Sequence, residues 1–201
     1  MTSMLPPSWW ACSFEGKVGD RMKLPCHCGR RAARLVLMMA PVLLLAACAG
    51  DLELPGEPSF YRSLATKDAQ LDAATAASMI SGYRANNGLS AVALDPELMK
   101  LAREQAQAMA SRNKLGHNVA RGFKERIKGY RAKAAVENVS AGYHTLAEAF
   151  SGWRDSPPHR ANMLLTGATR MGIAAVHAPE SKYKVFWALI LATPDEQRQR
   201  S

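Results

Sequence analysis

The chain has 201 residues, of which 48% are hydrophobic, and it carries 26 lysines and arginines against 17 aspartates and glutamates, a formal net charge of +9. This length fits one domain with appendages and excludes an assembly of several domains. A positive charge of this size is not by itself a nucleic-acid signature, because its weight depends on where the basic residues lie.

The most informative segment lies near the N-terminus. A basic stretch at residues 30–34 precedes an apolar run over residues 35–47, which ends in Leu-Ala-Ala directly before Cys48. A charged start, a short apolar core and a small-residue exit are typical of a secretory signal peptide. The run holds about 13 residues where a membrane span needs about 20, and Pro41 interrupts it, which disfavours the alternative of an uncut signal anchor. The segment resembles a bacterial lipoprotein signal, which implies cleavage before Cys48 and acylation of Cys48, palmitate being one such acyl group.

Residues 1–21 do not fit a signal peptide, since they contain Glu15, Asp20 and two tryptophans. We therefore interpret 1–21 as an extension, 22–47 as the signal peptide and 1–47 together as the leader, with translation expected to begin at Met22. Without the leader the chain keeps 20 basic and 15 acidic residues, a net charge of +5, and Cys48 as its one cysteine. A disulfide-free exported domain must be stabilised by packing, which about 154 residues permit. No nucleic-acid partner is expected.

The rest of the chain divides into a tether, a domain and a tail. Residues 48–63 contain two prolines and a glycine, which favour an extended lipidated tether. Residues 64–195 are predicted to form the domain and 196–201 the tail. Basic residues bunch between positions 121 and 133; we interpret them as the solvated face of a helix, the alternative being a contact with anionic lipid or polymer.

Hydrophobic periodicity predicts helices in the first part of the domain and strands at its end. Helices are expected over residues 66–87 and from Asp95 along the next stretch, where an acceptor cap precedes a proline at the first helical position. Shorter helices are expected near 122–130, 145–153 and 157–165. Residues 171–177 and 183–192 predict two strands of an antiparallel hairpin, and 136–140 a third. Because the strand at 183–192 is apolar on both faces, helices must cover both sides of the sheet. The predicted fold class is α+β, a three-layer α-β-α sandwich with a small antiparallel central sheet.

Three polar segments stand out in this framework: Gly-His-Asn at 116–118, Glu-Asn-Val-Ser-Ala-Gly at 137–142, and the stretch from Trp153 to Leu164 that contains Ser-Pro-Pro-His-Arg. Each taken alone has an ordinary structural explanation. The chain contains no nucleophile elbow, phosphate-binding loop or zinc-protease motif.

Five stretches in order resemble the CAP superfamily (cysteine-rich secretory, antigen 5 and pathogenesis-related proteins) in its bacterial branch. They are residues 83–89 with Arg-x-x-x-Gly-Leu, 94–98 with Leu-Asp-Pro-Glu-Leu, 137–142, 153–164, and Gly-Ile-Ala at 172–174 with Phe-Trp at 186–187. The resemblance implies an α-β-α sandwich with a central cleft that two histidines and two glutamates line in many members, some of which bind zinc or another divalent ion.

Carried onto this chain, the resemblance gives His117 and His159 as the two histidines and Glu137 as the first glutamate. The position of the second glutamate falls on Ser156, with Asp155 next to it, so the set of four is incomplete. His117 and His159 are the candidate metal ligands, and a weak divalent site is more plausible than an efficient metallohydrolase. No residue is assigned as catalytic.

Three functions remain open. The favoured one is a non-catalytic CAP-domain lipoprotein, attached to the membrane through lipid on Cys48, that binds a lipid, a cell-wall fragment or a protein at the cell envelope. The alternatives are a metal-dependent hydrolase of peptide or envelope polymer, which would use His117, Glu137 and His159, and a structural or adhesive spacer. Because alanine rather than aspartate follows Cys48, we expect the outer membrane where the organism has one.

Overall fold

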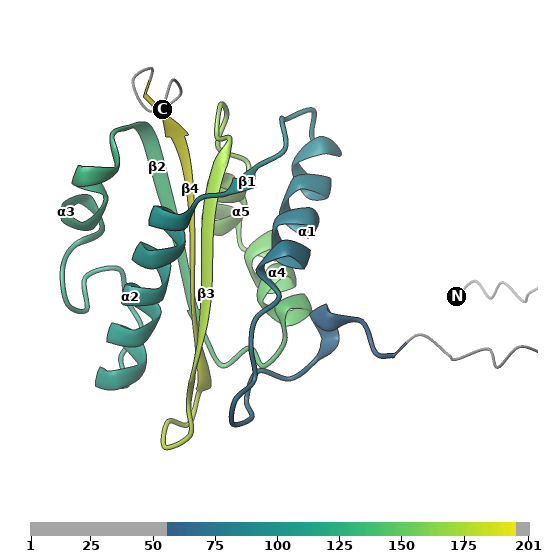
Figure 1. Ribbon diagram of the computed structural model, residues 1–201, viewed down its shortest axis with the longest axis vertical. Coiled ribbons are helices and arrows are strands. Elements are labelled where there is room, and N and C mark those ends of the chain that lie inside the picture. The colour runs from purple at the N-terminus through teal and green to yellow at the C-terminus, as the bar shows by residue number, and fades with distance from the viewer. Residues whose placement is uncertain (1–55, 196–201) are drawn as a thin grey trace, which may run out of the picture. The chain divides into compact units, whose positions relative to one another are not determined.

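The computed structural model describes residues 56–195. The predicted leader, Cys48, the first part of the tether and the tail at 196–201 lie outside the described residues. A central sheet stands between two layers of helices, with α2 and α3 on one face and α1, α4 and α5 on the other (Figure 1). The predicted α+β sandwich is therefore confirmed.

The sheet is mixed, with strand order β1-β3-β4-β2. Its three long strands, β2 (Ala132–Ala141), β3 (Arg170–Ala178) and β4 (Lys184–Pro194), pair antiparallel as expected. The expectation of a wholly antiparallel sheet is wrong at one edge, where β1 (Ala93–Leu94) pairs parallel with β3 at Arg170 and Met171. A strand of two residues is too short to produce a readable alternation.

The first long helix is shorter than predicted. It was expected from residue 66, but α1 spans Ala73–Ala85. Asp72 caps it, because its carboxylate accepts a hydrogen bond from the Thr75 N–H at 3.0 Å, and Asp68 has a left-handed φ of 63°, which no helix interior tolerates. The preceding short helix Ser59–Tyr61 packs on this cap, since the Ser59 hydroxyl donates to Asp72 at 2.8 Å.

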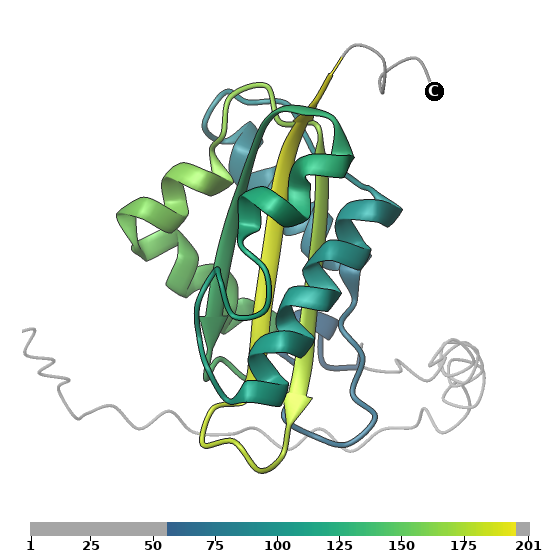
Figure 2. The same cartoon turned by 90° about the vertical axis from the view of Figure 1, so that its left-hand side faces the viewer.

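One face of the sheet is covered by α2 (Pro96–Arg112) and the short α3 (Phe123–Ile127), as Figure 2 shows from that side. The predicted cap at Asp95 and the apolar stripe of α2 are confirmed; the buried stripe consists of Leu98, Leu101, Ala102, Ala106 and Met109. The backbone of α2 lies so close to β3 that a Cβ at Gly172 would overlap the Leu98 carbonyl. Only glycine leaves room for this approach.

The opposite face carries α1, α4 (Leu146–Asp155) and α5 (Pro157–Met163). Thr145 and Glu148 form a capping box that fixes the start of α4. Trp153 of α4 meets Trp187 of β4 edge to face, with ring centroids 6.3 Å apart, in the centre of this core.

Among residues 56–195, every helix is too short or too polar to cross a membrane.

Candidate functional site

The three segments singled out in the sequence meet around strand β2. Glu137 lies on β2, His117 in the loop between α2 and α3, and His159 in α5. Adjacent side chains of a strand point to opposite faces, so Glu137 reaches the α3 layer while its neighbour Asn138 reaches α5. Strand β2 therefore joins the two sides of the site.

Glu137 is the buried centre of this arrangement, with 4% of its surface exposed. Its Oε2 lies 2.9 Å from Nδ1 of His117. The Nη2 of Arg126 donates to Oε1 at 2.7 Å and to Oε2 at 3.0 Å. The Glu137 carboxylate is thus bonded to a permanently charged guanidinium as well as to an imidazole, and the pair is almost fully enclosed.

His159 is held from the other side of β2 by a small amide network. The Asn138 amide donates to the His159 carbonyl at 2.9 Å, and the Asn162 amide donates to the Glu137 carbonyl at 3.1 Å and to Asn138 Oδ1 at 2.9 Å. These bonds fix α5 against β2, so the position of His159 follows from residues around it rather than from a direct bond to Glu137.

The surroundings of His159 lower the pKa of its imidazole. Burial lowers its pKa from 6.5, and the nearby His117 lowers it further when charged. The two histidines are therefore within electrostatic range of each other, and the site disfavours additional positive charge.

A pH dependence of stability follows from this shift. The unfolded chain binds a proton at His159 more readily than the folded protein, so the contribution of this residue is complete above about pH 6.5 and is lost as pH falls through the lowered folded value. We expect His159→Asn to flatten the decline of the free energy of unfolding between pH 7 and 5, measured by urea denaturation. An unchanged slope in His159→Asn would contradict the assignment.

Asp155 and Ser156 do not complete the predicted set. The Asp155 carboxylate bonds Nε of its neighbour Arg154 at 2.8 Å on the surface, with 66% of its side chain exposed, and this contact lowers its pKa. Ser156 precedes α5, but its hydroxyl makes no capping hydrogen bond. Among residues 56–195, neither side chain forms a hydrogen bond or ion pair with His117, Glu137 or Arg126.

The residues do not fit a metal ion of the kind the resemblance implies. In the described part of the chain, no three or more His, Cys, Asp or Glu side chains are grouped so that they could hold one. The carboxylate that would serve as third ligand is bonded to Arg126, and a guanidinium at this position repels a second cation. A site of two imidazoles alone lacks the three protein ligands that catalytic zinc takes.

Arg126 is the site residue that the sequence interpretation missed. It belongs to the basic run at 121–133, interpreted above as a solvated helix face. That interpretation is wrong for Arg126, which is 6% exposed, and for Lys133, which lies on strand β2. The Arg126 neighbours Lys124 and Lys128 are exposed as expected. The signal was present in its spacing, because Phe123, Arg126 and Ile127 fall on one face of a helical turn, but the partner Glu137 was not visible from spacing alone.

Comparison with solved structures shows which proteins share this fold. A SCP-domain extracellular protein from Bacillus anthracis superposes with a TM-score of 0.52 at 20% identity, covering 59% of this chain and 39% of that one. An outer surface protein from Borrelia burgdorferi gives 0.55 at 18% identity, covering 63% of this chain and 98% of that one. At this identity the likeness shows the fold, and the present chain spans well under half of the Bacillus protein. No curated protein matches.

The family comparison is more specific. The model of the CAP family, the cysteine-rich secretory protein family, matches residues 77–191, which is more than half of the chain. The matched stretch contains all five motifs that suggested the resemblance, together with His117, Glu137 and His159. The chain belongs to the CAP, cysteine-rich secretory protein family.

Proposed function

We propose that this protein is an exported lipoprotein, anchored through Cys48, whose CAP domain binds a cell-envelope ligand at the His117–His159 site without catalysing a reaction. Export is supported by the signal-like leader and by the extracellular and outer-surface structures that share its fold. Anchoring rests on the small-residue exit before Cys48.

One observation carries the non-catalytic assignment: the carboxylate of Glu137 is already used. A general base must be free to take a proton, and a metal ligand must offer a lone pair to the metal. Here both oxygens of Glu137 accept hydrogen bonds from Arg126 and one also contacts His117. The other carboxylate that the sequence analysis placed in the cleft, Asp155, is paired with Arg154 on the surface.

The charge balance of the site indicates what kind of ligand it takes. Arg126 and Glu137 neutralise each other, and the two imidazoles remain as hydrogen-bonding groups, with 48% of the His117 side chain exposed. Nδ1 of His117 donates to the Glu137 carboxylate, so the ligand meets the other ring nitrogen, which accepts a hydrogen bond in the neutral ring. Among the envelope ligands left open by the sequence, cell-wall fragments, which carry hydroxyl and amide donors beside carbonyl and carboxylate acceptors, fit this site best.

Calorimetric titration with purified muropeptides tests the proposal. We expect saturable binding by the wild-type protein, a loss of at least ten-fold in affinity in the double variant His117→Ala, His159→Ala, and unchanged muropeptides by chromatography after long incubation. Both substitutions remove a hydrogen-bonding imidazole from the site while leaving the Arg126–Glu137 pair intact.

Two controls separate the alternatives. His144→Ala, an exposed histidine outside the site, should bind as the wild type does. Zinc titration should show no binding that depends on His117 and His159; zinc-dependent cleavage that the double variant loses would establish the hydrolase instead. Saturable binding of lipid vesicles but not of muropeptides would reject the wall-fragment ligand.

A further inference from the structure

Strand β3 has an edge that the sheet leaves largely open. On one side it pairs with β4 along its whole length, from Arg170 to Ala178. On the other side β1 pairs with only Arg170 and Met171. From Gly172 onward, no strand in the described part of the chain lies against this edge.

The backbone groups of odd-numbered residues face this edge. The Met171 carbonyl accepts from the Asp95 N–H at 2.9 Å, and the Ile173 N–H points to the sulfur of Met99. By the two-residue alternation of a strand, the N–H and C=O groups of Ala175 and His177 point the same way. Within residues 56–195 these groups have no hydrogen-bond partner, so a pair of donors and a pair of acceptors stand free at the spacing of an extended chain.

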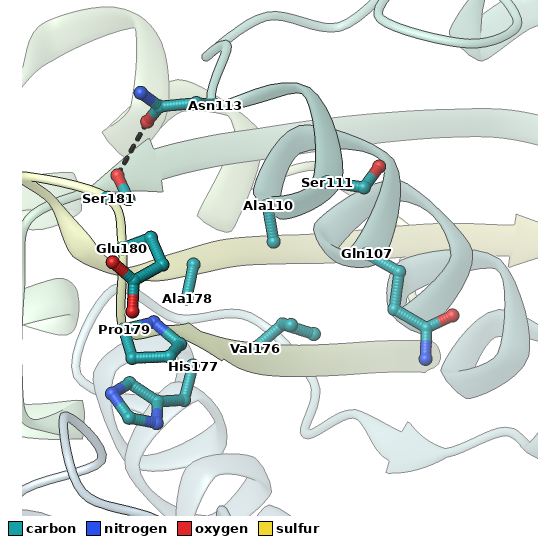
Figure 3. A pocket seen from close by; sticks show the side chains of 10 residues that line it. All are labelled: Gln107, Ala110, Ser111, Asn113, Val176, His177, Ala178, Pro179, Glu180 and Ser181. Atoms are coloured by element: carbon teal, nitrogen blue, oxygen red, sulfur yellow. Dashed lines mark hydrogen bonds between the residues drawn. The ribbon is translucent and has the colours of Figure 1, made fainter.

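A hollow of about 560 Å³ lies beside the same stretch, between the C-terminal half of α2 and the end of β3 (Figure 3). Ala110, Val176 and Ala178 give it apolar walls, and Gln107 and Ser111 of α2 add polar groups at its margin. At the other end, residues 69–71 lie next to Ile173–Ala175 around a smaller space of about 270 Å³ and close the groove there. The free pairing stretch is therefore Ala175–Ala178.

Beyond the part that lies next to residues 69–71, this edge lacks the devices that normally protect an open strand. Native edges are blunted by lysines, prolines, bulges or covering segments, and residues 172–178 contain only Gly, Ile, Ala, Val and His. The opposite edge strand, β2, is covered at Glu137 and Asn138 by the side chain of Asn162 from α5. The difference indicates that pairing at β3 is used rather than avoided.

We propose that the Ala175–Ala178 edge of β3 binds a short extended peptide of a partner protein, which adds as a further strand along the line begun by β1 and inserts one apolar side chain into the hollow beside α2. The free groups are backbone donors and acceptors, which an extended backbone matches and a lipid tail does not. The alternative occupant is a second copy of this chain, pairing antiparallel through the same edge. It would bring both α2 helices to one face of the joined sheet, since each lies over its own β3 (Figure 2). The concentration dependence of hydrogen exchange, described below, distinguishes this alternative from a peptide. This site is separate from the His117–His159 site and does not rest on the proposed function.

Hydrogen exchange of the purified protein gives the first test. In the free protein, the amides of Ala175 and His177 should exchange much faster than those of Ala174 and Val176, which face β4. A pool of acetylated and amidated heptapeptides, alternating threonine with leucine, valine or phenylalanine, should slow exchange at Ala175 and His177 by at least ten-fold at millimolar concentration. The same pool with N-methyl groups on alternate residues should not, because it lacks the pairing donors.

Variants locate the site. Ala110→Arg fills the hollow from the α2 wall and should abolish the peptide effect, while Ala161→Arg, an exposed alanine of α5, and His159→Ala should leave it unchanged. Protection of both amides in the free protein, or no response to the pool, would overturn the proposal. Protection that rises with protein concentration alone would assign the edge to a second copy instead.

Discussion

Replacing Arg84 by methionine is expected to lower the free energy of unfolding by more than about 4 kcal/mol, or to prevent folding. Arg84 is fully buried and bonds no carboxylate; its guanidinium donates to four backbone carbonyls, those of Ser90, Met163, Leu165 and Ala168, at 2.9–3.0 Å. Each buried carbonyl left without a donor costs about 1–3 kcal/mol. Urea denaturation followed by the fluorescence of the core tryptophans measures the loss.

The same four bonds explain why an arginine and not a lysine belongs here. The Arg84 guanidinium joins the end of α1 to the C-terminal end of α5 and the turn before β3. A single lysine ammonium cannot reach all of these carbonyl oxygens. Arg84→Lys should therefore fold, but its free energy of unfolding should be about half that of the wild type. Arg170→Met, at an exposed arginine at the start of β3, should change stability by less than about 0.5 kcal/mol; an equally mild effect at Arg84 would refute its role as the tie between these segments.

Replacing Arg126 by methionine is expected to cost about 3–5 kcal/mol at neutral pH. Methionine keeps the length of the side chain next to Phe123, but it leaves the enclosed Glu137 carboxylate without its guanidinium. Removing one member of a buried ion pair strands the other charge in a medium that solvates it poorly.

A double variant distinguishes charge from packing. Arg126→Met combined with Glu137→Gln should recover most of the lost stability, since a buried pair replaced as a whole costs little. Lys124→Met, an exposed basic residue of the same helix, is the matched control and should behave as the wild type. If the double variant were as unstable as Arg126→Met alone, the loss would reflect the shape of the side chain rather than the stranded carboxylate.

Much of the fold could be predicted from the amino-acid sequence. The cap and proline at Asp95 and Pro96 set the start of α2, and the all-apolar strand β4 required a layer on each side, which the sheet has. The start of α1 was missed by seven residues because Asp68 takes a left-handed conformation, which the helical spacing of its neighbours does not reveal. The two-residue β1 left no periodic signal at all.

Only part of the candidate site could be predicted from the sequence. His117, Glu137 and His159 were selected by motif, and the structure brings His117 against Glu137 and places His159 within electrostatic range. The decisive partner, Arg126, looked like one more surface charge in a basic run. Arg126 and Glu137 lie eleven residues apart, separated by the short helix at Lys128–Tyr130 and the first part of β2. Their contact therefore depends on how α3 packs on β2.

The amino-acid sequence alone determined the layers of this protein, because periodicity, caps and breakers act within a few residues of each other. It also determined which family motifs are present. Tertiary structure decided what those motifs can do: whether the Glu137 carboxylate is free, which backbone groups of β3 lack partners, and which carbonyls Arg84 ties together. These outcomes depend on ion pairs and hydrogen bonds between distant segments, whose strength is set by burial and by the approach of a few ångströms that only the packed chain provides.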